Sequence, residues 1–407
     1  MLKYFKGRIS QGFVSLYSGR MVLRITDGLL GLFLPIFLYQ LLDHDLKKVI
    51  WYYLIGNLLY GLVVAWGAKY LDKVGLRRSL RISIIWGAIF YFIFFILDRG
   101  MNSVSQGWNY QQIIFLLALS IFFLTIHRMM YWVPMHTDLA KFTSKSNRAK
   151  QLGLMEATAV ALGAVTPLLA GWILTHYNYD ILFLITILIF FASMIPFATL
   201  PKTKEIFSWG YLQTWKEFFS RRRRREVLAY AGDGAENAVG AIVWPIFIWE
   251  LLAGNYFIVG VLSSLIVVVT VGLQLFVGRF TDLSNKKKML KYGSIFYAIG
   301  WIIKIFIATA FQIFITSTYH NLARIFARTP FDTLNYEKAA DQGHYIDEYT
   351  VIHEMAVQFG KSLMLIFILF LIPFFNVQLT FVFAALASLL MNFLADEEVV
   401  KRESIID

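Results

Sequence analysis

Apolar segments of about 20 to 26 residues follow one another along almost the whole chain. A helix that crosses the hydrocarbon core of a membrane needs about 20 apolar residues, and all its backbone hydrogen bonds are made inside the protein. A content of 58% hydrophobic residues excludes an ordinary soluble domain. We count twelve such segments, so the sequence predicts an all-α integral membrane protein with twelve transmembrane helices. They begin near Leu16, Val49, Ser79, Gln111, Gln151, Asp180, Val227, Tyr256, Met289, Phe311, Tyr349 and Val377.

The chain repeats itself at an offset of 210 residues, which indicates two homologous halves. Segment 34–42 (LPIFLYQLL) aligns with 244–252 (WPIFIWELL), and Asp72 aligns with Asp282 at the same offset. We therefore expect two pseudo-symmetric six-helix bundles. The expected boundaries are 1–200 for the first bundle, 201–226 for a linker and 227–407 for the second bundle.

The net charge of +12 would suggest a nucleic-acid partner in a soluble protein, but its distribution indicates a different cause. Lys and Arg are concentrated in alternate connections between the apolar segments, at 69–81, 141–150, 202–225 and 279–291. This is the positive-inside pattern of membrane proteins. We expect a multi-pass protein of the cytoplasmic (inner) membrane with both termini in the cytoplasm, and no nucleic-acid partner.

The linker combines an amphipathic segment, Phe207 to Phe219, with a run of five arginines, Arg221 to Arg225. The amphipathic segment is expected to lie along the cytoplasmic face of the membrane. The arginines either bind anionic lipid headgroups or only fix the orientation of the next helix. Both interpretations stay open from the sequence alone.

The stretch Gly67 to Arg78 reads GAKYLDKVGLRR. It resembles the signature loop of the major facilitator superfamily, Gly-x-x-x-Asp-Arg/Lys-x-Gly-Arg/Lys-Arg/Lys, between transmembrane helices 2 and 3. Asp72 and Gly75 occupy motif positions, and one residue is inserted before the arginine pair. The second copy, 278–288, keeps the first glycine and the aspartate but lacks the later glycine.

The resemblance implies a non-enzymatic secondary transporter that works by alternating access, with two six-helix bundles around a central cavity. In this family such loops hold the cytoplasmic ends of the halves together while the protein is open to the outside. The resemblance thus implies a latch of Asp72, Arg77 and Arg78, with Asp282 as its counterpart and Asp138 as a plausible partner of the arginines. The alternative is a solvated loop that only sets topology.

Ionisable side chains inside transmembrane helices are costly and usually functional. Arg24 and Asp27 lie three residues apart near the middle of the first expected helix, so they share one helical face. An ion pair that faces the central cavity is one interpretation, and a structural tie between helices is the other.

The seventh expected helix contains GDGAENAVG from Gly232 to Gly240. Each glycine weakens a helix by about 1 kcal/mol, so we expect local unwinding, with close helix packing as the alternative. Asp233 and Glu236 are i,i+3 neighbours, and we interpret them as the proton-coupling pair. Lys361, inside the eleventh expected helix, is a candidate to bind an anion or to neutralise Glu236.

Arg128 and Glu156 of the first half recur as Arg324 and Glu354 in the second. These four residues form either ion pairs of an inner gate or plain ties between helices. The histidines lack metal-ligand spacing, so we expect no metal site, and nothing in the chain indicates a cofactor.

The first hypothesis for function is proton-coupled export of a small organic or amphiphilic molecule. The second is proton-coupled uptake of an organic anion, suggested by Arg24 and Lys361. The third is a lipid translocase or a non-transporting membrane receptor with the same fold. A mostly aromatic cavity favours the first hypothesis, and paired basic residues in the cavity favour the second. We expect a monomer.

The predicted topology can be tested with single cysteines, because the natural chain contains none. Cysteine at Thr203 or Ser284 is expected to be shielded from a membrane-impermeant thiol reagent in intact cells, whereas cysteine at Ser103 is expected to react. Reaction at Ser284 from outside the cell would contradict the two-half arrangement.

Overall fold

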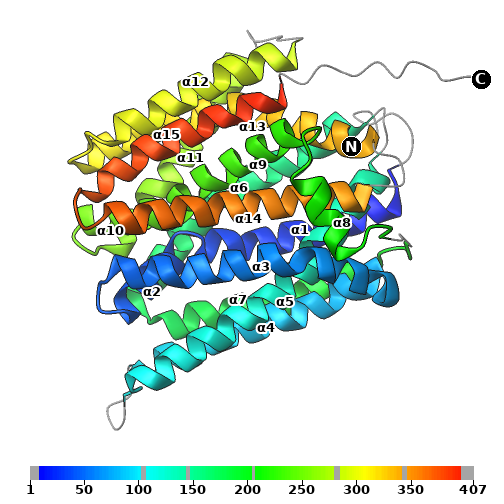
Figure 1. The fold of residues 1–407 in the computed structure, drawn as a ribbon. Coiled ribbons are helices and arrows are strands. Elements are labelled where there is room, and N and C mark those ends of the chain that lie inside the picture. The colour runs from blue at the N-terminus through cyan, green and yellow to red at the C-terminus, as the bar shows by residue number, and fades with distance from the viewer. Residues whose placement is uncertain are drawn as a thin grey trace, which may run out of the picture.

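The computed structural model describes residues 9–101, 107–143, 147–203, 207–278, 285–341 and 346–395. These residues form long helices joined by short turns, and no strand occurs among them (Figure 1). The all-α prediction is confirmed.

The long helices run side by side in one bundle (Figure 1). The first-half helices are α1 (Gln11–Leu30), α2 (Phe33–Leu41), α3 (Leu46–Val74), α4 (Leu76–Met101), α5 (Tyr110–Phe142), α6 (Arg148–His176) and α7 (Tyr179–Ala198). The linker holds α8 (Tyr211–Phe218). The second-half helices are α9 (Arg224–Ala238), α10 (Trp244–Leu251), α11 (Tyr256–Gly278), α12 (Lys286–Lys304), α13 (Ala310–Asp341), α14 (Ile346–Leu371) and α15 (Thr380–Leu390).

Each of the twelve expected segments coincides with one helix or with consecutive helices. By length and composition, eight helices of the described chain can cross a membrane, or nine if α1 and α2, bent by 44°, form one span. Of the other helices, α9 has only 15 residues before the π-helical stretch that follows it, and α13 carries polar and ionisable residues along its length. Asp233 of α9 is buried and contacts α13, so such groups face other helices rather than lipid.

The unwinding expected between Gly232 and Gly240 does not occur. α9 continues through a π-helical stretch, Val239–Val243, directly into α10. The glycines serve close packing instead, because a Cβ atom on Gly234 would lie 2.0 Å from the carbonyl oxygen of Val357 in α14. The bend is in the first helix, between α1 and α2.

The linker helix α8 is shorter than the expected amphipathic segment. It begins at Tyr211, because the preceding Gly210 has an extended backbone. Phe207 and Trp209 are buried before the helix starts. α8 lies at the end of the bundle where α3 turns into α4 at Gly75; we call this end the basic end, and it lies on the right in Figure 1.

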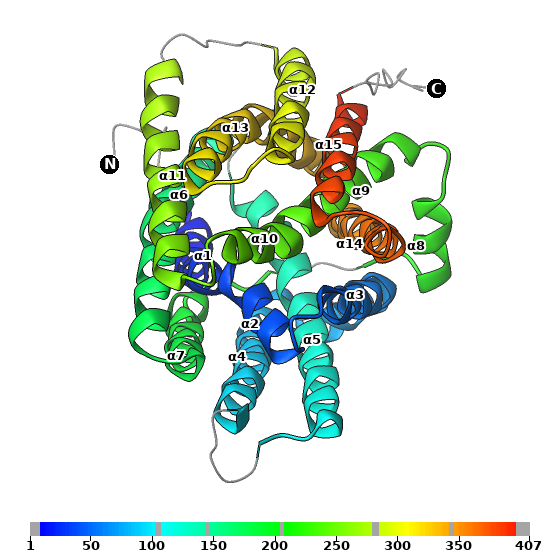
Figure 2. The ribbon, with the colours of Figure 1, turned by 90° about the vertical axis from the view of Figure 1, so that its left-hand side faces the viewer.

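The two halves meet along two helix pairs, α3 with α14 and α6 with α11. Figure 2, which views the bundle from the end opposite the basic end, shows these pairs on two sides of the bundle. Glycine permits the second contact, since a Cβ atom on Gly260 would lie 2.4 Å from the carbonyl oxygen of Pro167. Nearby, the Leu168 backbone N–H donates to the Ser264 hydroxyl at 3.0 Å.

The close packing of α9 and α14 predicts that Gly234→Ala lowers the apparent unfolding temperature of the purified protein. The added methyl group must push the two backbones apart, and such overpacking costs about 1–3 kcal/mol. Gly163→Ala is the matched control, because a Cβ atom on Gly163 meets nothing within 4 Å. Equal unfolding temperatures for the two variants would contradict this packing.

Candidate functional site

The basic residues of α1 gather around one carboxylate. Arg20 and Arg24 place their Nη1 atoms 3.7 and 3.6 Å from Oδ2 of Asp27. Arg20 is buried, donates to the Tyr131 hydroxyl at 3.3 Å and stacks over the Trp132 ring. The Asp27 side chain is 47% exposed, so this cluster reaches a space that water or a solute can enter.

Glu156 of α6 extends the α1 cluster toward the second half. The residue is exposed and interacts electrostatically with Arg24 and with Asp332 of α13. Charges from both halves therefore act on one another across the interface between them.

The second-half carboxylates expected to act together are held by different partners. Asp233 forms an ion pair with Nη1 of Arg328, whose Nε also lies 3.1 Å from Oδ2 of Asp332. Glu236 accepts a hydrogen bond from the Tyr297 hydroxyl at 2.6 Å. Both carboxylates are 5% exposed, so α9, α12 and α13 enclose them.

Two cations beside these carboxylates have no ion-pair partner among the described residues. Arg324 lies in the middle of α13 and is exposed, although the charge of Glu236 acts on it. Lys361 of α14 is half-buried and interacts electrostatically with Arg128, Arg328 and Glu354 without a direct contact. Both residues are about 20 Å along their helices at 1.5 Å per residue, which is near mid-depth.

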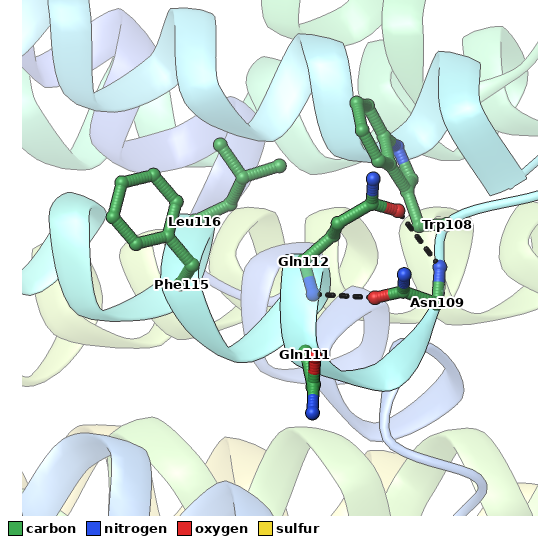
Figure 3. A pocket seen from close by; sticks show the side chains of 6 residues that line it. All are labelled: Trp108, Asn109, Gln111, Gln112, Phe115 and Leu116. Carbon is green, nitrogen blue, oxygen red and sulfur yellow. Dashed lines mark hydrogen bonds between the residues drawn. The ribbon is translucent and has the colours of Figure 1, made fainter.

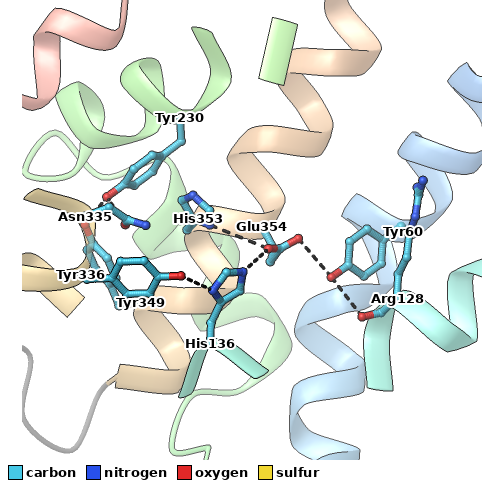
Figure 4. A network of polar contacts seen from close by, with 9 residues as sticks. All are labelled: Tyr60, Arg128, His136, Tyr230, Asn335, Tyr336, Tyr349, His353 and Glu354. Carbon is cyan, nitrogen blue, oxygen red and sulfur yellow. Dashed lines mark hydrogen bonds and ion pairs between the residues drawn. The ribbon is translucent and has the colours of Figure 1, made fainter. Parts of the chain in front are cut away.

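Glu354 of α14 joins helices of both halves (Figure 4). It accepts a hydrogen bond from the Tyr60 hydroxyl of α3 at 3.2 Å, and its Oε1 lies 3.6 Å from Nε2 of His136 in α5. His136 is within 3.1 Å of the Tyr336 hydroxyl of α13 through Nδ1. Glu354 thus contacts a tyrosine and a histidine rather than either candidate gate arginine.

Arg128 lies beside this network without an ion pair to a described carboxylate. Its Nη1 donates to Oδ1 of Asn57 at 3.3 Å, and its backbone carbonyl accepts from the Tyr60 hydroxyl at 3.4 Å. His353 lies 3.8 Å from Glu354 through Nδ1 and packs against Tyr230 (Figure 4).

The opposite end of the bundle has its own contacts between halves. The Tyr39 hydroxyl donates to Glu250, and the Tyr256 hydroxyl donates to Oε1 of Gln40 at 2.7 Å. Tyr39 and Gln40 correspond to Trp249 and Glu250 at the 210-residue offset. Equivalent segments of the repeat therefore contact each other, as expected around a pseudo-twofold axis.

The candidate latch is only partly described. The backbone of Asp72 is helical, while its side chain and Asp282 lie outside the described part of the chain. Arg78 is exposed, and Nη1 of Arg77 donates to the Leu200 carbonyl at 3.1 Å. Asp138, the plausible partner of these arginines, instead accepts a hydrogen bond from the Thr203 hydroxyl at 2.7 Å.

A pocket of about 380 Å³ lies where α5 begins, lined by Trp108, Asn109, Gln111, Gln112, Phe115 and Leu116 (Figure 3). Asn109 and Gln112 cap the helix through reciprocal hydrogen bonds. None of the charged residues described above lines this pocket. Among the described residues, no group of histidines and carboxylates has the arrangement of a metal site.

Sequence reasoning missed Arg328, His136 and Tyr297, which partner the predicted carboxylates. The sequence did contain an indication for Arg328, because it follows Arg324 by one helical turn and so shares its helical face. No sequence signal links Tyr297 to Glu236, because their contact depends on how α9 and α12 pack.

Comparison with known proteins supplies the family context. A sequence model described as the Major Facilitator Superfamily matches residues 16–232, more than half of the chain. Among solved structures, that of the human organic anion transporter MFSD10 (TETRAN) matches with a TM-score of 0.69 and 12% identity, over 96% of this chain and 100% of that chain. At this identity the likeness concerns the fold alone. No curated protein matches the chain significantly.

Proposed function

Because the chain belongs to the major facilitator superfamily of secondary transporters, we propose that it carries a small organic anion across a membrane together with protons. It is a multi-pass membrane protein and not an enzyme. Of the alternatives left open by the sequence, the charge distribution of the site favours anion transport over export of an amphiphile.

The observation that carries this proposal is the pair of cations Lys361 and Arg324. Both lie near mid-depth, and neither forms an ion pair with a described residue. A cation that has no direct ion-pair partner can contact an anionic substrate without first breaking an ion pair inside the protein. Arg24 and Arg128 of the first half are partly exposed, and they add positive electrostatic potential to the site.

We propose that Asp233 and Glu236 couple this anion to protons. Arg328 forms an ion pair with Asp233, and the positive charge of Arg324 acts on Glu236. A bound anion offsets the positive charge, so it favours proton uptake by the carboxylates. By reciprocity, a proton on either carboxylate strengthens binding of the anion.

The contacts at the two ends support alternating gates between rigid halves, 1–200 and 227–407. At the basic end, Tyr60 and His136 of the first half hold Glu354 of the second. At the far end, Tyr39 holds Glu250. Opening either side requires its contacts to break, while α3 with α14 and α6 with α11 supply the surfaces on which the halves rock.

We assign the basic end to the cytoplasm of the cell, with the protein in the inner membrane, because Lys and Arg concentrate there. Asp72, Arg77 and Arg78, with Asp282, remain the proposed latch at this end. Glu156 and Arg128 belong to the gate region by position, and Arg324 is assigned to the anion site.

Transport by purified protein in proteoliposomes with an imposed pH gradient tests the substrate class. Benzenesulfonate, benzenesulfonamide and phenyltrimethylammonium are similar in size and differ in charge, and only the sulfonate is expected to be transported. Arg324→Gln and Lys361→Gln are each expected to raise its half-saturating concentration at least about ten-fold, since hydrogen bonds to charged groups contribute about 1.5–3 kcal/mol.

Lys69→Gln is the matched control for these variants, because Lys69 is exposed near the basic end of α3, outside the anion site. It removes the same charge and is expected to leave the half-saturating concentration unchanged. Preferential transport of phenyltrimethylammonium, or normal saturation by both site variants, would contradict the proposal.

A further inference from the structure

The linker helix α8 lies across the bundle axis at the basic end, beside α3 and α14 (Figures 1 and 2). The Tyr211 hydroxyl donates to the Leu62 carbonyl of α3 at 3.2 Å. The Trp215 and Phe218 rings lie 5.4 and 5.9 Å from the Phe359 ring of α14. One face of α8 is therefore fixed to both halves of the protein.

Two large apolar side chains of the α8 segment are exposed, beside the exposed Lys216. Leu212 is 81% exposed, and Phe219, at the end of the helix, is 75% exposed. Exposed apolar side chains on a helix at the basic end of the bundle are placed to contact lipid chains.

Four of the five arginines that follow α8 divide into two groups. Arg223 is 8% exposed, lies over the Trp209 ring, and has Glu217 and Glu226 within 3.5 and 3.8 Å. This arginine is part of the protein's own packing and is not available to a ligand.

Three other arginines of the run, Arg221, Arg222 and Arg224, are exposed. No ion pair joins any of the three to a described carboxylate. Three cations directly beside exposed apolar side chains match the chemistry of a phospholipid that carries a net negative charge, with acyl chains on Leu212 and Phe219 and a phosphate at the guanidinium groups.

We propose that α8 and these three arginines form a binding site for anionic phospholipid of the leaflet at the basic end. The site requires both parts of the lipid, because the arginines bind the headgroup and the exposed apolar side chains bind the acyl chains. It does not depend on which molecule the protein transports. A lipid bound there contacts α8, and α8 in turn contacts both α3 and α14.

The test is the apparent unfolding temperature of the full-length protein in neutral detergent with added lipid. Phosphatidylglycerol is expected to raise it by about 3 °C or more at saturation, because a ligand bound only to the folded state stabilises it. Phosphatidylcholine and free glycerol phosphate, which supply chains without net charge and a headgroup without chains, are expected to have little effect.

The triple variant Arg221→Gln, Arg222→Gln, Arg224→Gln is expected to lose most of this shift while keeping its lipid-free unfolding temperature, because all three side chains are exposed. The double variant Leu212→Gln, Phe219→Gln is expected to lose the shift with its charges intact. The matched control replaces Lys69, Lys288 and Lys291 with Gln; these side chains are exposed at the same end.

A full shift in the arginine variant would overturn the proposal. So would an equal loss in the lysine control, which would show a general effect of surface charge. An equal shift with glycerol phosphate would show a free phosphate site in place of a lipid site.

Discussion

An ionised side chain inside a membrane protein must be balanced by an opposite charge, a hydrogen bond or water, and this requirement organises the structure. The ionisable groups of α1 and α9 obey it through Asp27 with two arginines, Asp233 with Arg328, and Glu236 with Tyr297. Lys361 and Arg324 differ, since no described carboxylate pairs with either. These two cations are available to contact an anion directly, and this availability is the physical basis of the proposed function.

The same charges lie where the two halves meet, which connects binding with movement. Glu354 contacts Tyr60 and His136 across the interface, while the charges of Lys361 and Arg128 act on it from nearby. In the proposed mechanism, a substrate at Lys361 changes the electrostatic balance on Glu354, the carboxylate that joins the two halves near the basic end. The close backbone contact at Gly260 and Pro167 fixes another part of the interface, so rigid halves can tilt about it.

Much of the fold follows from the sequence because membrane helices need long apolar segments, and the 210-residue repeat fixes their grouping. The positions of Asp27, Asp233 and Lys361 inside helices were also readable, since helix rise converts residue number into depth. The partners of Asp233, Glu236 and Glu354 were not readable, because Arg328, Tyr297 and His136 meet these carboxylates through packing between distant helices. The expected unwinding near Gly234 was wrong because the sequence does not show that Val357 packs against that glycine.

The central claim is that a bound anion and a bound proton stabilise each other through shared cations. The most direct measurement is proton uptake when benzenesulfonate is added to purified protein in weakly buffered detergent near neutral pH with a pH indicator. The sulfonate stays ionised, so any proton bound must be bound by the protein. The account predicts uptake by the natural protein and none by the double variant Asp233→Asn, Glu236→Gln, which still binds the anion. Anion binding without proton uptake, or equal uptake by the double variant, would contradict it.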